Sequence, residues 1–503
     1  MVTANPAAAP AAQINLNAPL KWTAATALQQ KMLRALQGNI LKGHGRLFTA
    51  NIFLTFGADA QAARRLVRDM ANHHVIDAYA QLLATKHFKE TGEPGGDFCH
   101  LALSFAGYHA LGQAASAPTD PDFRLGMRDP ASIAALHDPA VSHWEKPFRH
   151  ALHAIVLAAS ETEATCARLT AGLIERIEDS GATVQHVQHG KQLMSAAGEG
   201  IEHFGYVDGR SQPLMLVEDI DNEVGAAGSS RWDPAFPLGT ALVPDPGVAD
   251  PAAKVYSFGS YFVFRKLEQH VRQFKKREQD IADTLGLTGG ARELAGAMIV
   301  GRFEDGTPVT MSNTARTAEP PHNQKPPNDF NYEGDAGTRC PFHGHIRKTN
   351  PRGTGGAEPE ADERKHLMAR RGITYEDVKR PVNPEELPEG EDSAEFDAKV
   401  APHLPTGGVG LLFMAYNNVI GNQFKFTQQT WANTNNFPVG KPNPTNGIDP
   451  IIGQAAAVGD PRVPNVWDDP GAGNNLACQF SGFVQMKGGE YFFSPSLSFL
   501  KAL

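Results

Sequence analysis

The sequence predicts an α+β protein in which antiparallel β-sheets are covered by helices. Two observations support this class. Apolar, β-branched and aromatic runs recur along the chain and are bounded by Gly, Asp or Asn, which is typical of strands. Between them lie segments in which apolar residues return at helical spacing, so that strands and helices alternate with long gaps.

Strand-like runs occur in both halves of the chain. Each is short enough for a single strand, and most are bounded by turn-forming residues. The predicted strands are "LFTANIFLTF" (47–56), "HLALSFAGY" (100–108), "HAIVLAA" (153–159), "SYFVFRKL" (260–267) and "GVGLLFMAY" (408–416).

Two segments carry the helical pattern, one in each half. Apolar residues three or four positions apart share one face of a helix, which can then pack on a sheet. The segment 162–178 carries Ala164, Leu169, Leu173 and Ile177 in this way. The segment 265–285 carries Leu267, Val271, Phe274, Ile281 and Leu285, with Lys and Glu between them.

The composition restricts the class of protein. A chain of 503 residues predicts roughly two to four domains. The hydrophobic share of 41% and the net charge of -9 are ordinary for a globular protein and argue against nucleic acid as the main partner. No apolar run approaches the length of a membrane span, and the N-terminus lacks a secretory pattern. We therefore expect a cytoplasmic protein without membrane contact.

The four cysteines are widely spaced and form no CxxC pair, which weakly favours a reducing compartment over a disulfide framework. They are Cys99, Cys166, Cys340 and Cys478.

Three stretches are not predicted to form regular elements. Residues 1–35 begin with an Ala- and Pro-rich arm and are predicted to be disordered. Residues 217–255 are rich in Gly, Pro, Ala and Asp and are predicted to connect two domains. Residues 312–407 form long inserted loops, which suggests that the loops have a function. Within them, the acidic segment 381–400 is interpreted as a solvated loop.

The segment "FGYVDGRSQP" places Asp208 between two glycines. Glycine leaves the backbone almost unconstrained, so this segment is predicted to be a turn. A carboxylate on a turn can cap a helix, bind a metal or carry a proton within a pocket. These residues alone leave the three alternatives open.

The segment "RCPFHGHIRKTNPR" (339–352) contains a C-x-x-H-x-H pattern. A structural zinc site needs a fourth ligand and a matching partner motif, which the sequence lacks. A surface loop with clustered histidines is the plain alternative. Several arginines follow, and one imidazole beside guanidinium groups also suits haem, whose iron takes a histidine and whose propionates need cations.

Six segments, in the right order, resemble the dye-decolourising peroxidase family. The resemblance runs from about residue 36 to the C-terminus, and the long insertions resemble the larger subgroup of the family. The segments are "LQGNILKGHGRLFTANIFLTF", "FGYVDGRSQP", "CPFHGHIRKTNPR", "ARRGITY", "GVGLLFMAYNNVIGNQFKFTQQTWANTNNF" and "GGEYFFSPSLSFLKAL".

The resemblance implies an α+β fold of two ferredoxin-like domains, each an antiparallel sheet flanked by helices. An N-terminal domain over 36–216 would end in the loop that carries Asp208. The segment 217–255 would be the interdomain connection. The C-terminal domain over 256–503 would hold most of the haem.

The resemblance also implies the central roles. His345 would be the axial haem iron ligand, with an acceptor on its second ring nitrogen that the sequence does not identify. His343 is the rival in the same loop, but the family pattern places the ligand directly before "IRKTNPR". Asp208 would be the distal acid–base catalyst. Arg370, rather than the adjacent Arg371, would stabilise negative charge on the bound peroxide.

Further positions match the family's haem pocket. Asn350 and Arg352 match residues near a haem propionate, and Leu411 and Phe413 match apolar residues that line the distal side. Outside the pocket, Trp431 and Tyr375 match positions at which related enzymes form surface radicals, so they would pass electrons from bulky donors; most such aromatic residues only pack.

Together these residues imply a haem b peroxidase with one haem per chain. It would reduce hydrogen peroxide and oxidise aromatic dyes, phenols or similar one-electron donors through an oxo-ferryl intermediate. Because an aspartate remains a base in acid, we expect an acidic activity optimum. The alternatives are a haem-handling protein that oxidises porphyrinogens or releases iron, and a non-enzymatic haem carrier or sensor. The oligomeric state is open.

Overall fold

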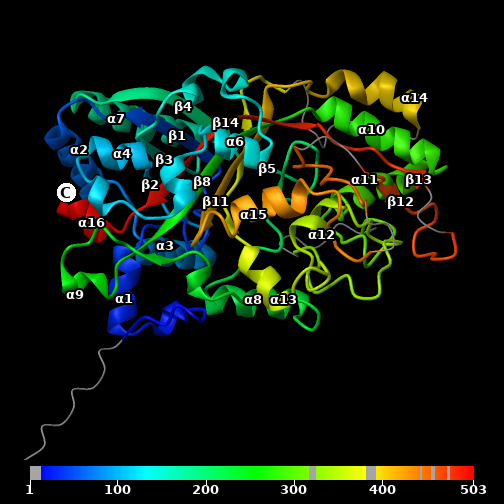
Figure 1. Ribbon diagram of the computed structural model, residues 1–503, viewed down its shortest axis with the longest axis horizontal. Helices are drawn as coiled ribbons and strands as arrows, with labels where there is room; N and C mark the ends of the chain where they lie inside the picture. Colours follow the sequence, from blue (N-terminus) through cyan, green and yellow to red (C-terminus); the bar gives the residue numbers. More distant parts are fainter. Residues whose placement is uncertain (1–12, 317–324, 381–391, 442–444, 455–458, 473–475) are drawn as a thin grey trace, which may run out of the picture.

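The computed structural model describes residues 13–316, 325–380, 392–441, 445–454, 459–472 and 476–503. The predicted α+β class is confirmed. Within the described residues, a ten-stranded sheet has the order β10-β11-β8-β14-β2-β3-β1-β4, with β7 paired to β8 and β9 paired to β11. All of its pairings are antiparallel. In Figure 1, α2, α4 and α7 lie beside β1–β4 at one end, and α10, α11 and α14 lie at the other.

The strands match all five predicted runs. The large sheet contains β1 (Phe48–Thr55), β2 (Phe98–Leu103), β3 (Ala154–Ser160), β4 (Thr183–Lys191), β7 (Val243–Pro244), β8 (Phe258–Gln269), β9 (Ala369–Arg370), β10 (Ile373–Glu376), β11 (Val409–Asn417) and β14 (Val484–Ser494). Two small ladders pair β5 (Leu193–Met194) with β6 (Gly200–Ile201), and β12 (Arg462–Val463) with β13 (Leu476–Ala477).

The strands of both halves of the chain join in this one sheet. In the middle, β14 pairs with β2 through Phe493 and Leu103. At the outer edges, the Thr374 hydroxyl on β10 donates to the Lys191 carbonyl on β4 and accepts a 3.1 Å bond from the Leu193 amide. The edge strands therefore meet, and the sheet curls into a barrel.

Helices flank the sheet or pack on other helices and loops. They are α1 (Ala27–Ala35), α2 (Ala60–His73), α3 (Ala78–Thr91), α4 (Phe105–Ala110), α5 (Pro121–Leu125), α6 (Pro130–Leu136), α7 (Glu163–Asp179), α8 (Val217–Ala227), α9 (Pro251–Lys254), α10 (Val271–Thr284), α11 (Glu293–Val300), α12 (His345–Thr349), α13 (Glu360–Glu363), α14 (Ser393–Glu395), α15 (Phe424–Phe426) and α16 (Leu497–Ala502).

Helix α7 shows why the predicted helices form. Thr162 caps its first turn by accepting from the Thr165 amide, and it buries Leu173 and Ile177 at a spacing of four. This face packs on β1 and β3. Burial of a leucine side chain is worth about 2 kcal/mol, so packing stabilises the helix more than its intrinsic propensity does. Both predicted helices are present, but the second, α10, begins only at Val271. The first part of the predicted segment 265–285, including Leu267, belongs to strand β8.

The structure corrects the three stretches predicted to be irregular. Residues 27–35 form α1, because a capping box at Thr26 starts the helix and its buried face packs on α3 and α16. Residues 217–255 include α8, β7 and α9, and residues 312–407 include β9 and β10 within the sheet. Residues 1–12, 317–324 and 381–391 lie outside the described residues. The described part of the acidic segment is not a solvated loop: residues 393–400 are helical, and Phe396 and Val400 are buried.

The run 100–108 is also shorter as a strand than predicted. β2 ends at Leu103, because the Ser104 hydroxyl accepts a 3.0 Å bond from the Gly107 amide and starts α4.

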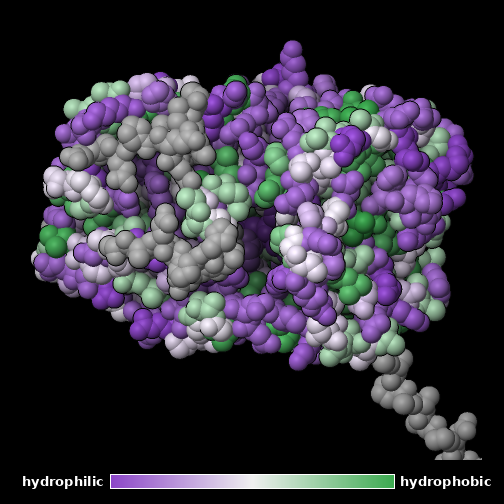
Figure 2. All heavy atoms as spheres, turned by 180° about the vertical axis from the view of Figure 1, so that it is seen from behind, coloured by the Kyte–Doolittle hydropathy of each residue, from purple (hydrophilic) through white to green (hydrophobic). Residues whose placement is uncertain are grey.

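The surface is mainly hydrophilic on the face shown in Figure 2, with hydrophobic residues scattered among polar ones. Among the described residues, no helix is long and apolar enough to cross a membrane. All four cysteines are buried and free.

Candidate active site

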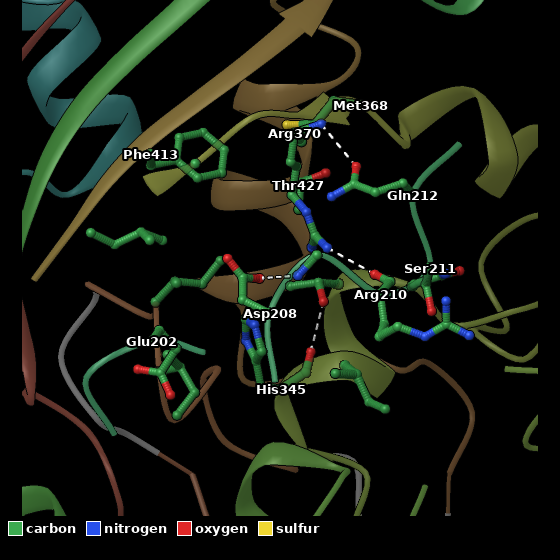
Figure 3. Close-up of a pocket in the computed structure, with 18 of the residues that line it drawn as sticks. Glu202, Asp208, Arg210, Ser211, Gln212, His345, Met368, Arg370, Phe413 and Thr427 are labelled. Carbon is green, nitrogen blue, oxygen red and sulfur yellow. Dashed lines mark hydrogen bonds between the residues drawn. The ribbon is translucent and has the colours of Figure 1, made fainter. Parts of the chain in front are cut away.

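A cavity of about 300 Å³ lies where the second half of the sheet meets the loops that follow β6 and precede α12. Figure 3 shows side chains from these separate segments converging on it. The seven residues predicted to act on or hold the cofactor all line it: Asp208, His345, Asn350, Arg352, Arg370, Leu411 and Phe413.

Asp208 lies at the end of a narrow hairpin. Ile201 and Val207 pair across this hairpin, and the Asp208 amide donates a 2.9 Å bond to the Gly200 carbonyl. Gly209 follows with a φ of +80°, a conformation that other residues seldom adopt. The carboxylate is exposed and accepts a 2.6 Å bond from the Gly209 amide. The turn thus directs a carboxylate with unused acceptor capacity into the cavity.

Arg370 extends into the cavity from β9. Its amide donates a 3.0 Å bond to Gln212 Oε1, and its Nη2 donates a 3.0 Å bond to the Arg210 carbonyl (Figure 3). The adjacent Arg371 guanidinium instead donates to the carbonyls of Asn39 and Ile40, at 2.8 and 2.9 Å. Arg371 also lines the cavity, but its guanidinium is engaged by the first half of the chain.

His345 is the first residue of α12, and its imidazole lines the cavity. Its Nδ1 lies 2.9 and 3.0 Å from the two carboxylate oxygens of Asp449, which is fully buried. No described residue forms a hydrogen bond with His345 Nε2. A carboxylate on Nδ1 fixes the tautomer in which Nε2 carries a lone pair, and this is the form that ligates a metal.

His343 lies elsewhere. It is 2% exposed, it does not line the cavity, and burial lowers its pKa to about 3. Burial also raises the pKa of Cys340 to about 12. Among the described residues, no three or more His, Cys, Asp and Glu side chains gather where a metal ion could bind. The zinc interpretation of C-x-x-H-x-H therefore has no support in this loop.

Asp449 is the acceptor that the sequence did not identify. Its Oδ1 also accepts from the amides of Ile451 and Ile452, at 2.8 and 2.9 Å. It lies 104 positions from His345, so no local spacing links the two residues. The only signal is the segment "GIDPIIG", in which an aspartate before proline is typical of a turn.

A cluster of three arginines borders the cavity. The Arg352 guanidinium donates to the carbonyls of Asn328 and Phe330, at 2.8 and 2.5 Å, and Arg302 donates to Asn328 Oδ1 at 3.1 Å. Arg210 pairs with Glu223 at 2.9 and 3.1 Å. Sequence reasoning predicted only Arg352 of the three.

The three guanidinium groups of this arginine cluster outnumber the carboxylates that pair with them; Glu223 pairs with Arg210. Burial, with the neighbouring guanidinium groups, lowers the pKa of Arg302 to about 9 and that of Arg352 to about 10. Arg210 Nε is buried without a partner, and so is the Tyr332 hydroxyl. Such a site suits an anionic ligand with carboxylate groups.

Leu411 and Phe413 form part of the apolar wall. They are alternate residues of β11 and are less buried than Gly410, Leu412 and Met414. Side chains on a strand alternate between faces, so Leu411 and Phe413 face the cavity while their neighbours face the core.

Trp431 and Tyr375 do not lie at the surface, which corrects the prediction of surface radical sites. Each is 1% exposed, and neither lines the cavity. Trp431 stacks on Phe437, with ring centroids 5.3 Å apart, and it lies 5.3 Å from the His366 ring, which does line the cavity. Tyr375 is packed in the sheet beneath the Lys266 ammonium, 4.7 Å from its ring centroid.

Glu202 is a second carboxylate that lines the cavity and was not predicted. It accepts bonds of 2.8 and 3.0 Å from the amides of Phe204 and Tyr206, so it holds the hairpin that leads to Asp208. Burial raises its pKa from 4.5 to about 7.

Comparison with known proteins places these features in a family. Residues 35–191 match the model of the DyP dimeric alpha+beta barrel domain. The chain is 44% identical over 496 residues to the multifunctional dye peroxidase DyP2 from Amycolatopsis sp. (strain ATCC 39116 / 75iv2), covering 97% of this chain and 100% of the relative. The solved structure of DyP2 superposes with a TM-score of 0.87, with the same coverage of both chains.

Two further structures are similar. The DyP-type peroxidase of Anabaena sp. is 36% identical, covers 94% of each chain and has a TM-score of 0.82. A dye-decolorizing peroxidase in complex with 2,6-dimethoxyphenol is 28% identical, covers 93% of this chain and 98% of its own, and has a TM-score of 0.69.

Proposed function

This chain belongs to the dye-decolourising peroxidase family, and we propose that it binds one haem b and uses hydrogen peroxide to oxidise aromatic dyes or phenols. One observation supports this most strongly. His345 faces the same cavity as Asp208 and Arg370, with its Nδ1 fixed by buried Asp449. A positioned acid and a cation opposite a ligating imidazole suit peroxide chemistry, whereas a haem carrier has no need of them.

The residues present fit haem. His345 Nε2 would ligate the iron, and the arginine cluster of Arg210, Arg302 and Arg352 would face the propionates. The orphaned Arg210 Nε and the excess of buried positive charge support this assignment. When bound, haem would supply an iron at which hydrogen peroxide binds and a centre that peroxide can oxidise by two electrons.

Asp208 would move the proton. Its free carboxylate oxygen can take a proton from one peroxide oxygen and return it to the other, which then leaves as water. Arg370 would stabilise the negative charge that develops as the O–O bond breaks, and it is held for this by the Arg210 carbonyl. Leu411 and Phe413 would exclude water from this side, which strengthens both interactions.

We also propose that the two halves of the barrel correspond to ferredoxin-like domains over 36–216 and 256–503, joined by 217–255. The second would hold most of the haem. In support, His345, Arg302 and Arg352 all follow residue 256, whereas Asp208 comes from the end of the first.

The donor is proposed to be a phenol or an aromatic dye. The relative described above binds 2,6-dimethoxyphenol. For donors too large to enter, Trp431 would act as a buried relay, because its ring lies next to His366 at the cavity wall. A Trp431→Phe, Tyr375→Phe double variant should then oxidise bulky dyes slowly and small phenols normally. Unchanged turnover of bulky dyes would contradict the relay.

The proposed function is tested by titrating haem into the apoprotein and then adding hydrogen peroxide with 2,6-dimethoxyphenol. Wild type should give the Soret band of a histidine-ligated ferric haem and peroxide-dependent oxidation. His345→Ala should lose the histidine-ligated spectrum, whereas His343→Ala, the matched control from the same loop, should keep it. If wild type binds no haem, or if His343→Ala alone loses the spectrum, the assignment is wrong.

A further inference from the structure

Lys348 is a fully buried lysine that no role assigned so far explains. It lies on α12, three positions after His345, and its side chain has no exposed area. Its Nζ donates to three backbone carbonyls, those of Thr434, Phe437 and Gly447, at 2.8, 2.7 and 2.8 Å. Burial of an ammonium group costs desolvation free energy, which such hydrogen bonds offset only in part. A buried lysine at this position is therefore more easily explained by a specific role.

The three carbonyl acceptors indicate that the Lys348 side chain is in its ammonium form. Burial lowers the pKa of Lys348 to about 7, and the Asp449 carboxylate opposes the shift. Three carbonyl acceptors require three hydrogens, which only the ammonium form supplies. A buried ammonium thus joins helix α12 to three separate points of another segment.

That segment carries Asp449. Gly447, whose carbonyl accepts from Lys348, lies two positions before Asp449, whose carboxylate meets His345 Nδ1. The two residues of α12 therefore contact the same segment, His345 through its ring and Lys348 through its ammonium. The Asp449 carboxylate also accepts from the amides of Ile451 and Ile452, and its own amide donates to the Ala432 carbonyl at 2.8 Å.

We propose that Lys348 is the positioning residue of the proximal side: it fixes residues 434–437 and 447–449 against α12, and thereby keeps the Asp449 carboxylate on His345 Nδ1. The inference rests on the proposed function, since it matters for catalysis only if His345 ligates haem. A firmly held carboxylate makes the imidazole a stronger electron donor to the iron. Lys348 would therefore influence the iron–histidine bond through Asp449 and His345, without contacting the haem itself.

Two other roles for Lys348 make different predictions. If it acted only as a nearby positive charge, its removal would favour ferric iron and lower the midpoint potential. If it only stabilised the fold, its removal would lower the melting temperature and leave the iron–histidine bond unchanged. Loss of positioning instead weakens the Asp449–His345 contact, which lowers the iron–histidine stretching frequency and raises the potential.

The experiment compares reconstituted wild type, Lys348→Met, Asp449→Asn and the double variant by resonance Raman spectroscopy of the ferrous state. Lys348→Met should shift the iron–histidine frequency in the same direction as Asp449→Asn, and should add no further shift in the double variant. Its haem should dissociate roughly 10-fold faster than from wild type. Lys365→Met, an exposed lysine paired with Asp362, is the matched control and should match wild type.

A second readout needs no haem. In apoprotein with ¹⁵N-labelled histidine, the Nδ1 proton of His345 should exchange with water faster in Lys348→Met than in wild type. If Lys348→Met does not fold, Lys348→Gln retains two donors and should give smaller shifts in the same direction. Unchanged frequency and exchange in a folded variant would overturn the inference. Failure of wild type to bind haem would overturn the proposed function, and the exchange measurement would still decide the inference.

Discussion

The two sides of the cavity are built in different ways. On the His345 side, the imidazole meets Asp449, and that carboxylate also accepts from the amides of Ile451 and Ile452. On the Asp208 side, the Asp208 carboxylate accepts, among the described residues, only from the adjacent Gly209 amide, and one guanidinium nitrogen of Arg370 donates to one carbonyl.

The difference shows what each side has to do. A ring whose one nitrogen is held by a buried and well-bonded carboxylate keeps one orientation, which suits a permanent ligand to iron. Groups with free lone pairs and hydrogens can bond to a molecule that enters and leaves, which suits a proton carrier and a charge stabiliser. We therefore expect substitutions on the Asp208 side to affect turnover and substitutions on the His345 side to affect haem retention.

The largest effect is expected for Asp208→Asn. The amide keeps an acceptor for the Gly209 amide but cannot take a proton, so kcat/KM for hydrogen peroxide should fall about 10²–10⁴-fold. Stopped-flow mixing of the ferric enzyme with peroxide measures this directly. Asp221→Asn, an exposed aspartate on α8, is the control. A wild-type rate of reaction with peroxide in Asp208→Asn would contradict the assignment of turnover to the Asp208 side of the cavity.

A smaller loss is expected for Arg370→Leu. Removal of one preorganised charge stabiliser should lower the peroxide rate constant about 10²–10³-fold, with the Soret band retained. Arg371→Leu should instead lower the melting temperature, because its guanidinium donates to Asn39 and Ile40. If the two variants exchanged phenotypes, the assignment of the distal arginine would be wrong.

A change on the other side of the cavity, Asp449→Asn, should act mainly on retention. Loss of the carboxylate partner of His345 should weaken haem affinity about 10–100-fold. Haem transfer to apomyoglobin measures the dissociation rate. A variant that kept its haem but lost peroxide reactivity as severely as Asp208→Asn would contradict the division between the two sides.

The smallest effect on turnover is expected for Glu202→Gln, which changes the pH dependence of stability. Burial raises the folded-state pKa of Glu202 from 4.5 to about 7. The folded state therefore binds this proton more tightly, so the contribution of Glu202 to stability is complete below pH 4.5 and is lost as the pH rises through about 7. Wild type should lose more stability than Glu202→Gln over this window in thermal melts, and exposed Glu175→Gln should behave as wild type.

The sequence predicted the elements that have a strong local pattern. β8 contains the aromatic and β-branched run "YFVF", β11 is mostly apolar, and α7 has a clear apolar face, so each was found. β4 was not found, because "TVQHVQHGK" is polar and only half-buried, and its pairing with β1 defines it as a strand. The joining of both halves in one sheet depends on long-range pairing, which no local pattern contains.

The same limit applies to the site. Asp208 and His345 stand in short motifs and could be named. Arg302 reaches the cavity, and Asp449 reaches His345, through tertiary packing. The sequence gives no spacing that links either residue to the site. Trp431 was placed by motif, but its burial follows from stacking on Phe437 and could not be predicted.

The sheet that joins both halves has a consequence for synthesis. The last helix, α16, packs on α1 and α2, and Gln37 near the N-terminus donates a 2.8 Å bond to the Pro495 carbonyl near the C-terminus. The first half of the chain emerges from the ribosome long before these C-terminal residues are synthesised. Until then, part of its hydrophobic core stays exposed to solvent. We expect this nascent chain to depend on chaperones, and haem to enter only after translation has ended.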